Sequence, residues 1–192
     1  HMNYIKQVLG REAFHPVGAL SMMILEDGPL FITDTQVHLH PKPEEIAKIA
    51  VGAARHVRRF GLSPNIAMCA HSQFGNLQSD TGDRLRAAIA LLDAMELDFT
   101  YEGEMNIDSA LDPELRARIF PGNKMQGAAN VLIFANADAA SGVRNILKSK
   151  ADGLEVGPIL MGLGNKAHIV TPSITARGLL NMAAIAGTPV TH

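Results

Sequence analysis

The pattern of apolar and polar positions divides the chain into short strands and longer helices. Short apolar runs predict strands at Val17–Leu25, Leu30–Thr33, Asn65–Ala70, Phe99–Tyr101, Asn130–Phe134, Leu154–Leu160 and Ala167–Val170. Apolar positions three and four residues apart predict helices at Pro43–Phe60, Asp83–Met95, Ser109–Ile119, Asp138–Ser149 and from Pro172 onward. Because strands and helices alternate from Asn65 to the end, the pattern predicts an α/β fold in which helices cover both faces of a mostly parallel sheet.

Two local signals add detail to this pattern. Asp27-Gly28 lies between the first two apolar runs and predicts that they form a hairpin or adjacent strands. Near the other end, "KAHIVTPSITARGLLN" predicts a strand that turns directly into a helix, with Thr171 as N-cap and Pro172 at the first helical position. A helix N-terminus with Arg177 one turn in is suited to hold an anion, either for catalysis or for binding alone.

Composition and charge narrow the classes of function. The chain has 192 residues, enough for one domain or two small lobes, and 47% of them are hydrophobic, which is typical of a globular chain. A net charge of −2 gives no general attraction to nucleic acid or acidic membranes, and no apolar run approaches the length of a membrane span. The single Cys69 excludes an internal disulfide and fits a reducing, cytoplasmic setting. His1-Met2 is typical of a tag-cleavage scar, so we expect a fragment that starts at residue 3.

Ligands of parallel α/β sheets bind at the carboxyl ends of the strands. We expect any site to draw on five loops there, which are Ala70–Gly82, Gly103–Leu111, Ala135–Ala140, Met161–Lys166 and Thr171–Arg177. After Glu155 the chain has no Asp or Glu, whereas Lys166 and Arg177 remain. The last part of the chain is therefore electropositive, suits an anionic ligand and offers no carboxylate as a general base.

Three short motifs have competing interpretations. "GLGNKA" (Gly162–Ala167) has the letters of a dinucleotide fingerprint, but it precedes a strand instead of opening a helix, so we reject that interpretation. His38 and His40 lie two apart as a metal pair would, but no carboxylate or Cys nearby completes the set, which favours a surface or interface role. Cys69 and His71 are either a thiol nucleophile with its base or, more commonly, a buried small side chain beside a loop histidine.

The polar segment "AHSQFGN" (Ala70–Asn76) follows a predicted buried strand. It is either an ordinary polar loop or a backbone-rich cradle for an anion. Composition alone favours neither interpretation.

Longer stretches resemble a known family. "EGEMNIDSALDPELRARIFPGNKMQGAANVLIFANADAASGVRNILK" and "VGPILMGLGNKAHIVTPS" resemble the phosphotransacetylase (phosphate acetyl/butyryltransferase) family, most specifically in Gly127–Asp138 and Gly157–Lys166. "AHSQFGN", "FITDTQVHLHPKPEEIA" and "HIVTPSITARGLLNM" resemble the C-terminal phosphotransacetylase-like domain of bacterial hybrid NADP-dependent malic enzymes. The resemblance covers about Leu30 to Ile185. It implies a three-layer α/β fold of the phosphotransacetylase and isopropylmalate dehydrogenase type, with residues 3–192 as the C-terminal part of that domain.

The chain departs from this family at the positions that carry its chemistry. Active members have Ser-Arg-Gly where this chain reads Thr171-Pro172-Ser173, and an Asp in the next turns, where it reads Ala176-Arg177-Gly178. The family's Ser and Arg position acetyl phosphate and polarise the acyl group, and its Asp is the proposed base for the CoA thiol. Proline cannot replace a bidentate phosphate donor, and no acid replaces the base, so we expect no catalytic residue here.

The resemblance implies a non-catalytic domain that binds acetyl-CoA and allosterically inhibits an attached malic enzyme, which decarboxylates malate oxidatively. The fragment itself would hold no cofactor or metal, and NADP and a divalent metal would belong to the malic enzyme domain. The expected acetyl-CoA contacts are Ser72, Asn76, Asn136, Asn165, Lys166, Thr171, Ser173 and Arg177. Among them, Lys166 and Arg177 would bind the phosphates. Family members dimerise through this lobe, so the apolar run Leu20–Leu25 lies either at a homodimer interface or in the core.

Two alternative functions stay open. An active phosphate acyltransferase with rearranged residues would exchange an acyl group between CoA and phosphate. A pure oligomerisation module would keep the shape of the cleft without using it.

Overall fold

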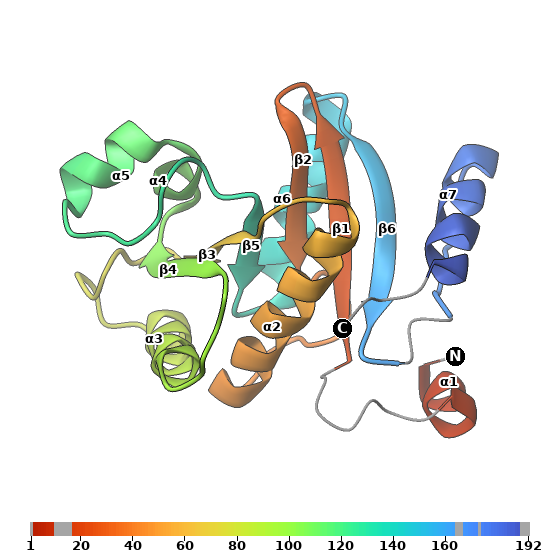
Figure 1. Cartoon of the computed structure of the whole chain (residues 1–192), viewed down its shortest axis with the longest axis horizontal. Helices are drawn as coiled ribbons and strands as arrows, with labels where there is room; N and C mark the ends of the chain where they lie inside the picture. The colour runs from red at the N-terminus through yellow and green to blue at the C-terminus, as the bar shows by residue number, and fades with distance from the viewer. Residues whose placement is uncertain (1, 10–16, 164–166, 173, 189–192) are drawn as a thin grey trace.

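The computed structural model describes residues 2–9, 17–163, 167–172 and 174–188. Their six strands form one sheet in the order β4-β3-β5-β2-β1-β6 (Figure 1). The strands are β1 (Gly18–Leu25), β2 (Gly28–Thr33), β3 (Asn65–Cys69), β4 (Thr100–Met105), β5 (Val131–Phe134) and β6 (Leu154–Met161). The helices are α1 (Met2–Leu9), α2 (Pro43–Arg59), α3 (Asp80–Asp93), α4 (Ile107–Leu111), α5 (Pro113–Ile119), α6 (Ala137–Lys150) and α7 (Ala176–Gly187).

The sheet is mostly parallel, as the alternation of elements predicts. β3 pairs in parallel with β4 and β5, and β2 pairs in parallel with β5. β1 is antiparallel to both of its neighbours, β2 and β6, so β6 points the same way as the other strands. The expected hairpin is also confirmed, because Leu25 of β1 pairs with Gly28 of β2.

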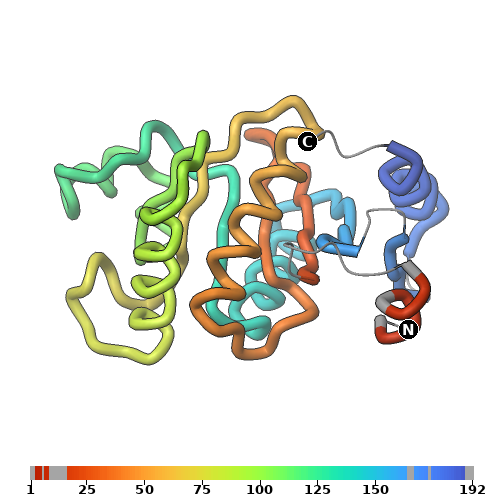
Figure 2. The backbone as a smooth tube through the Cα atoms, turned by 60° about the horizontal axis from the view of Figure 1, so that its bottom comes forward, coloured from red at the N-terminus to blue at the C-terminus, as the bar shows by residue number. Residues whose placement is uncertain are grey.

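Helices cover both faces of the sheet, which confirms the three-layer arrangement. On one face, α2 and α3 lie side by side, and Ile46 of α2 packs with Val131 of β5 (Figure 2). On the other face, Ala140 of α6 packs with Leu132 of the same strand. Successive residues of β5 therefore point to opposite layers, and α7 joins the first layer through Met182.

The apolar run Leu20–Leu25 lies inside the sheet, between β2 and β6. Leu20, Met22 and Met23 are buried within the chain itself, whereas Ile24 is 41% exposed. The core interpretation therefore applies to the three buried residues. A homodimer interface stays a prediction.

A proline divides the predicted helix Ser109–Ile119 into α4 and α5. Pro113 occupies the start of α5, where the missing N–H has no helical partner to lose. Asp112 caps this new helix, because its carboxylate accepts hydrogen bonds from the backbone N–H groups of Glu114 at 2.9 Å and Leu115 at 3.0 Å. One predicted helix is thus two short ones.

β4 extends to Met105, beyond the predicted Phe99–Tyr101. The apolar pattern does not predict this extension, because it includes the polar residues Glu102 and Glu104. Both are buried and accept hydrogen bonds instead of facing water. Between them, Gly103 has a φ of +145°. A Cβ at that position would lie 2.7 Å from the backbone oxygen of Met68, so the close approach of β3 and β4 requires glycine.

The predicted last strand and the predicted start of the last helix are both wrong. Residues 167–170 have no regular secondary structure, and α7 begins at Ala176 instead of Pro172. The cap is Thr175, whose hydroxyl oxygen accepts a hydrogen bond from the backbone N–H of Gly178 at 3.0 Å. Thr171 instead begins a turn, because its carbonyl accepts a hydrogen bond from the N–H of Ile174 at 3.0 Å.

Arg116 holds the loop between α5 and β5 in place. Its side chain is buried, and its guanidinium donates to the backbone oxygens of Ser109, Ala110, Met125 and Gly127 and to the side-chain oxygen of Asn123. This one side chain therefore satisfies four carbonyls.

We predict that Arg116→Ala destabilises the chain strongly, because it removes the donor to the buried backbone oxygens of Ser109 and Met125. The loss in the free energy of unfolding should be about 3 kcal/mol or more in urea titrations. The control is Arg118→Ala in the same helix, which removes an exposed arginine and should change the stability by less than about 0.5 kcal/mol. Equal stabilities of the two variants would contradict this role.

His168 attaches the irregular segment 167–170 to β6. Its Nδ1 accepts a hydrogen bond from the backbone N–H of Leu160 at 3.0 Å, which requires an unprotonated nitrogen. Burial, with a smaller repulsion from Arg59, lowers the pKa of His168 to about 4. In the unfolded chain the pKa of a histidine is about 6.5. Between the two values the unfolded state binds the extra proton, so stability falls as the pH falls through this window.

We therefore predict that the wild-type chain loses more stability than His168→Asn when the pH drops from about 7 to about 4.5. The asparagine oxygen can still accept the bond from Leu160, but it does not titrate. Urea titrations across the window measure the difference, and other titrating groups cancel between the two proteins. Parallel stability profiles would show that His168 does not contribute.

Candidate functional site

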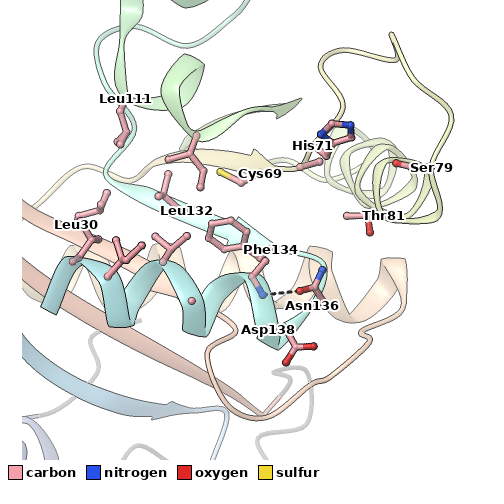
Figure 3. Close-up of a pocket in the computed structure, with 17 residues that line it drawn as sticks. Leu30, Cys69, His71, Ser79, Thr81, Leu111, Leu132, Phe134, Asn136 and Asp138 are labelled. Atoms are coloured by element: carbon pink, nitrogen blue, oxygen red, sulfur yellow. Dashed lines mark hydrogen bonds between the residues drawn. The ribbon is translucent and has the colours of Figure 1, made fainter. Parts of the chain in front are cut away.

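An apolar cleft of about 740 Å³ opens at the carboxyl ends of β3 and β5, on the α6 face of the sheet (Figure 3). Its size lies within the range of about 300–1,000 Å³ that small-molecule sites occupy. Most of its walls are aliphatic, and polar side chains gather at one end. The lining residues are Leu30, Cys69, Ala70, His71, Ser79, Thr81, Ile107, Leu111, Leu132, Phe134, Asn136, Asp138, Ala139, Gly142, Val143, Ile146 and Leu147.

Two helix N-termini meet at the polar end of the cleft. Asn136 caps α6, because its side-chain oxygen accepts a hydrogen bond from the backbone N–H of Ala139 at 2.8 Å. Ser79 caps α3 in the same way, accepting from the N–H of Gly82 at 3.0 Å. Helix N-termini carry a partial positive charge, and Asp138 in the first turn of α6 offsets part of it. Of the expected contact residues, Asn136 is thus placed at the cleft.

Ser72 and Asn76 lie in the loop after β3 and serve the loop itself. Ser72 is buried, and a Cβ on Gly82 would come within 2.5 Å of its hydroxyl, so Ser72 sits against the first turn of α3. Asn76 is exposed, and its side-chain oxygen accepts a hydrogen bond from the N–H of Gln73 at 2.8 Å. Neither residue lines the cleft.

The segment 70–76 does hold a carboxylate, but the carboxylate belongs to the chain. Gly75 donates its backbone N–H to Glu104 Oε1 at 3.0 Å, and Phe74 donates to the backbone oxygen of the same residue at 2.7 Å. The N–H of Gln73 donates to the side-chain oxygen of Asn76, and the N–H of Asn76 donates to the backbone oxygen of Gln73. Because these donors already have acceptors, the polar-loop interpretation is correct and an open anion cradle is not.

Glu104 is a site feature that sequence analysis missed. Its side chain is fully buried, and Oε1 also accepts from Arg86 of α3 at 2.7 Å, while Oε2 has no partner among the described residues. The ion pair links β4 and α3 beside the cleft. In the sequence, Glu104 is a charged residue in a short strand with few apolar neighbours. This pattern is typical of a surface position, so it does not indicate burial.

The alternative of a thiol nucleophile is contradicted. Cys69 is buried, and its Sγ donates to the backbone oxygen of Ala67 at 3.6 Å. Burial raises the pKa of the thiol, so a thiolate does not form at neutral pH. His71 is exposed beside it, and the pair is a buried small side chain next to a loop histidine.

The His38 and His40 pair does not form a metal site in the described part of the chain, which holds no group of three or more metal-ligating side chains. The Nε2 of His38 lies 2.7 Å from the backbone oxygen of Val17, whereas His40 is exposed. Among the same residues, no helix is both long and apolar enough to cross a bilayer.

Thr171 and Arg177 do not line the cleft. Both are exposed, and α7 packs on β6, which is separated from β5 by β2 and β1. Thr171 lines a separate hollow of about 160 Å³ together with Leu154, which begins β6. The segment 167–170 therefore returns along β6, and α7 starts away from the carboxyl edge. The expectation that the loop Thr171–Arg177 lies at that edge is wrong, because no last parallel strand forms.

The hollow beside Thr171 contains two cations that are already paired. Arg144 and Lys148 of α6 both contact the carboxylate of Glu155, which also accepts a hydrogen bond from Ser21. These contacts hold the pKa of Glu155 below its usual value, against the effect of burial. Asn165, Lys166 and Ser173 lie outside the described residues.

The comparisons with known proteins agree with the fold. A family model described as "Phosphate acetyl/butaryl transferase" matches residues 2–187. An NAD-dependent malic enzyme of Rhizobium meliloti is 41% identical over 100% of this chain and 25% of its own length. An NADP-dependent malic enzyme of Salmonella typhimurium is 38% identical over 97% of the chain and 25% of its own length. The chain thus spans about a quarter of these relatives.

Solved structures give the same result. A phosphotransacetylase (EutD) from Staphylococcus aureus superposes with a TM-score of 0.88 and 25% identity, over 94% of this chain and 56% of that protein. A phosphotransacetylase from Streptococcus pyogenes gives 0.89 at 23% identity, over 96% and 57%, and supports the fold alone. Because the family model matches nearly the whole chain, this chain belongs to the phosphate acetyl/butaryl transferase family.

Proposed function

We propose that this chain is the regulatory, phosphotransacetylase-like part of a hybrid malic enzyme, which binds acetyl-CoA without turning it over and thereby inhibits the attached malic enzyme. One observation carries the proposal: the start of α7 stands apart from the apolar cleft. Pro172 and Arg177, at positions where the family resemblance calls for a phosphate donor and a base, lie beyond β6, whereas the cleft opens at β3 and β5. Acyl transfer needs those groups beside the thioester.

The relatives support the malic enzyme part of the proposal. Proteins named malic enzymes match this chain over nearly all of its length, and the chain spans about a quarter of them. Oxidative decarboxylation of malate, with a nicotinamide cofactor and a divalent metal, would then belong to the remainder of such a protein. The two relatives are named for NAD and for NADP, and NADP is our proposal here.

The chemistry of the cleft suits a thioester ligand. Aliphatic side chains such as Leu132 and Val143 offer an apolar surface to the pantetheine arm and the acyl group. At the polar end, Asn136 and the N-termini of α3 and α6 offer hydrogen bonds and partial positive charge to amides or phosphates. Inhibition further requires two arrangements of the whole protein that acetyl-CoA binds unequally. A homodimer and a cytoplasmic location are part of the same proposal.

We predict that acetyl-CoA binds this chain and that Gly142→Leu weakens the binding at least tenfold. Gly142 lines the cleft, and a Cβ there meets no atom within 4 Å, so leucine fills the ligand space without a clash. In calorimetry the wild-type chain should release or absorb heat, and acetyl-CoA at 100 times its Kd should stabilise it by about 2.7 kcal/mol. The control is Ser149→Leu, an exposed position of α6 outside the cleft, which should bind as the wild type does.

Three outcomes separate this proposal from its alternatives. Absence of both heat and thermal shift with excess acetyl-CoA would contradict it. Release of CoA from acetyl-CoA and phosphate, lost in Arg177→Ala, would instead support an active acyltransferase. Dimers that form without any binding of acetyl-CoA would support a pure oligomerisation module.

We also predict that acetyl-CoA inhibits malate decarboxylation in the full-length protein and that Gly142→Leu relieves the inhibition. The basal rate should stay unchanged, because Gly142 belongs to the cleft of this domain and to no malate site. Steady-state rates with increasing acetyl-CoA measure the effect, with Ser149→Leu as the control. Equal inhibition of wild type and Gly142→Leu would place the effector site elsewhere.

A further inference from the structure

Arg84 of α3 crosses the carboxyl edge of the sheet beside the polar end of the cleft. Its Nη1 donates to the backbone oxygen of Pro41 at 2.9 Å and to that of Ala135 at 2.7 Å. Its Nε donates to the carboxylate of Asp80, one turn earlier in the same helix, at 2.9 Å. The side chain of Arg84 is 17% exposed, and its two bonds to backbone oxygens are partly buried, whereas its bond to the exposed Asp80 faces water.

The two acceptor carbonyls belong to the segment before α6, which borders this end of the cleft, and to the loop after β2, which contacts that segment. Ala135 directly precedes Asn136, which caps α6 and lines the cleft. Pro41 ends the loop after β2, and in the same junction Ala137 donates its N–H to the backbone oxygen of Leu39 at 3.4 Å. The two bonds from Arg84 therefore reach the same two segments that this long and weak hydrogen bond joins.

The opposite wall of the polar end belongs to the helix that carries Arg84. Ser79 and Thr81, at the start of α3, line the cleft and face Asn136 and Asp138 of α6 across it (Figure 3). Among the hydrogen bonds of the described residues, the bond from Arg84 to Ala135 is the one that joins α3 to the segment that begins α6. One guanidinium thus supplies this hydrogen-bonded link between the two helix N-termini.

We propose that Arg84 is a positioning residue, which fixes the spacing of the α3 and α6 N-termini and so sets the affinity of the cleft for an acyl-CoA. The inference rests on the proposed function for the identity of the ligand, but the structural role does not. Arginine suits the task because its planar fork holds Asp80 and the two carbonyls at once. Lysine, with a single charged nitrogen, can keep a carbonyl contact but cannot reproduce the fork.

The structural role is tested first, without any ligand. In hydrogen–deuterium exchange we expect Arg84→Ala to speed exchange of the amides at 36–42 and 135–140 at least tenfold, with Ala137 as the most direct reporter. Arg84→Lys should lie between Arg84→Ala and the wild type. The control is Arg58→Ala, which removes the exposed ion pair between Arg58 of α2 and Asp98 and should leave these amides unchanged. Unchanged exchange in Arg84→Ala would overturn the inference.

Affinity is measured next, by calorimetry with acetyl-CoA. We expect Arg84→Ala to raise the Kd roughly tenfold, as the loss of hydrogen bonds to a charged group would do, and Arg84→Lys to recover part of it. Arg58→Ala should bind as the wild type does. A Kd unchanged in Arg84→Ala despite faster exchange would also overturn the inference. If the wild-type chain does not bind acetyl-CoA, the proposed function fails, while the exchange result still decides whether Arg84 fixes the two helices.

Discussion

The buried carboxylate of Asp34 fixes the carboxyl edge of the sheet, and the candidate site depends on that edge. Asp34 accepts hydrogen bonds from the backbone N–H of Ala19 in β1 at 3.1 Å and from the N–H groups of Gln36–His38 at 3.0–3.1 Å. Burial raises the pKa of this carboxyl group, against these donors. The start of β1 and the loop after β2 are thereby held together. Pro41, at the end of this loop, is one of the two points to which Arg84 attaches.

Carboxylates of the chain itself occupy hydrogen-bond donors that an enzyme acting on phosphate would leave free for its substrate. Glu104 takes the N–H of Gly75 and the guanidinium of Arg86, and Glu155 takes Arg144 on the other side of the molecule. Each ion pair is partly or fully buried, so the cation is not available to a ligand without leaving a charge unpaired. A ligand in the cleft would therefore be bound by apolar contacts and by the two helix N-termini. Among the described residues, the lining of the cleft includes Asp138 but no lysine or arginine, which supports the proposal that the cleft binds a thioester without transferring its acyl group.

Most of the fold follows from the sequence because apolar periodicity reports burial directly. The helix Pro43–Arg59 and the strand Val131–Phe134 are found where the pattern predicts them. The exceptions are places where a polar contact decides the structure. Most of β4 was not predicted, because its buried glutamate pairs with Arg86, which is distant in sequence. The helix break at Pro113 depends on a capping contact that apolar periodicity does not report.

The candidate site was less predictable than the fold for a related reason. Asn136 lies at the cleft, as expected for a residue in the loop at the carboxyl end of a parallel strand. Ser72 looks like a ligand-binding serine in sequence, but it packs against Gly82, a contact that only the tertiary structure supplies. The contacts of Arg84 with the backbone oxygens of Pro41 and Ala135 were not predicted, because carbonyl acceptors carry no signature in the side-chain sequence.

The geometry at the end of the chain links fold to function. A strand at 167–170, paired in the sheet, would deliver α7 to the carboxyl edge beside the cleft. Instead, His168 joins this segment to β6 through its ring, and a turn from Thr171 to Ile174 leads to a helix capped by Thr175. Proline at 172 suits such a turn, because it donates no hydrogen bond and its φ is fixed. Proline at this position, where the family resemblance calls for arginine, thus fits the turn that leads to α7 beyond β6. The altered residues at 171–177 and the position of α7 beyond β6 are consistent with one another, and both support the proposal that this domain binds its ligand without transferring the acyl group.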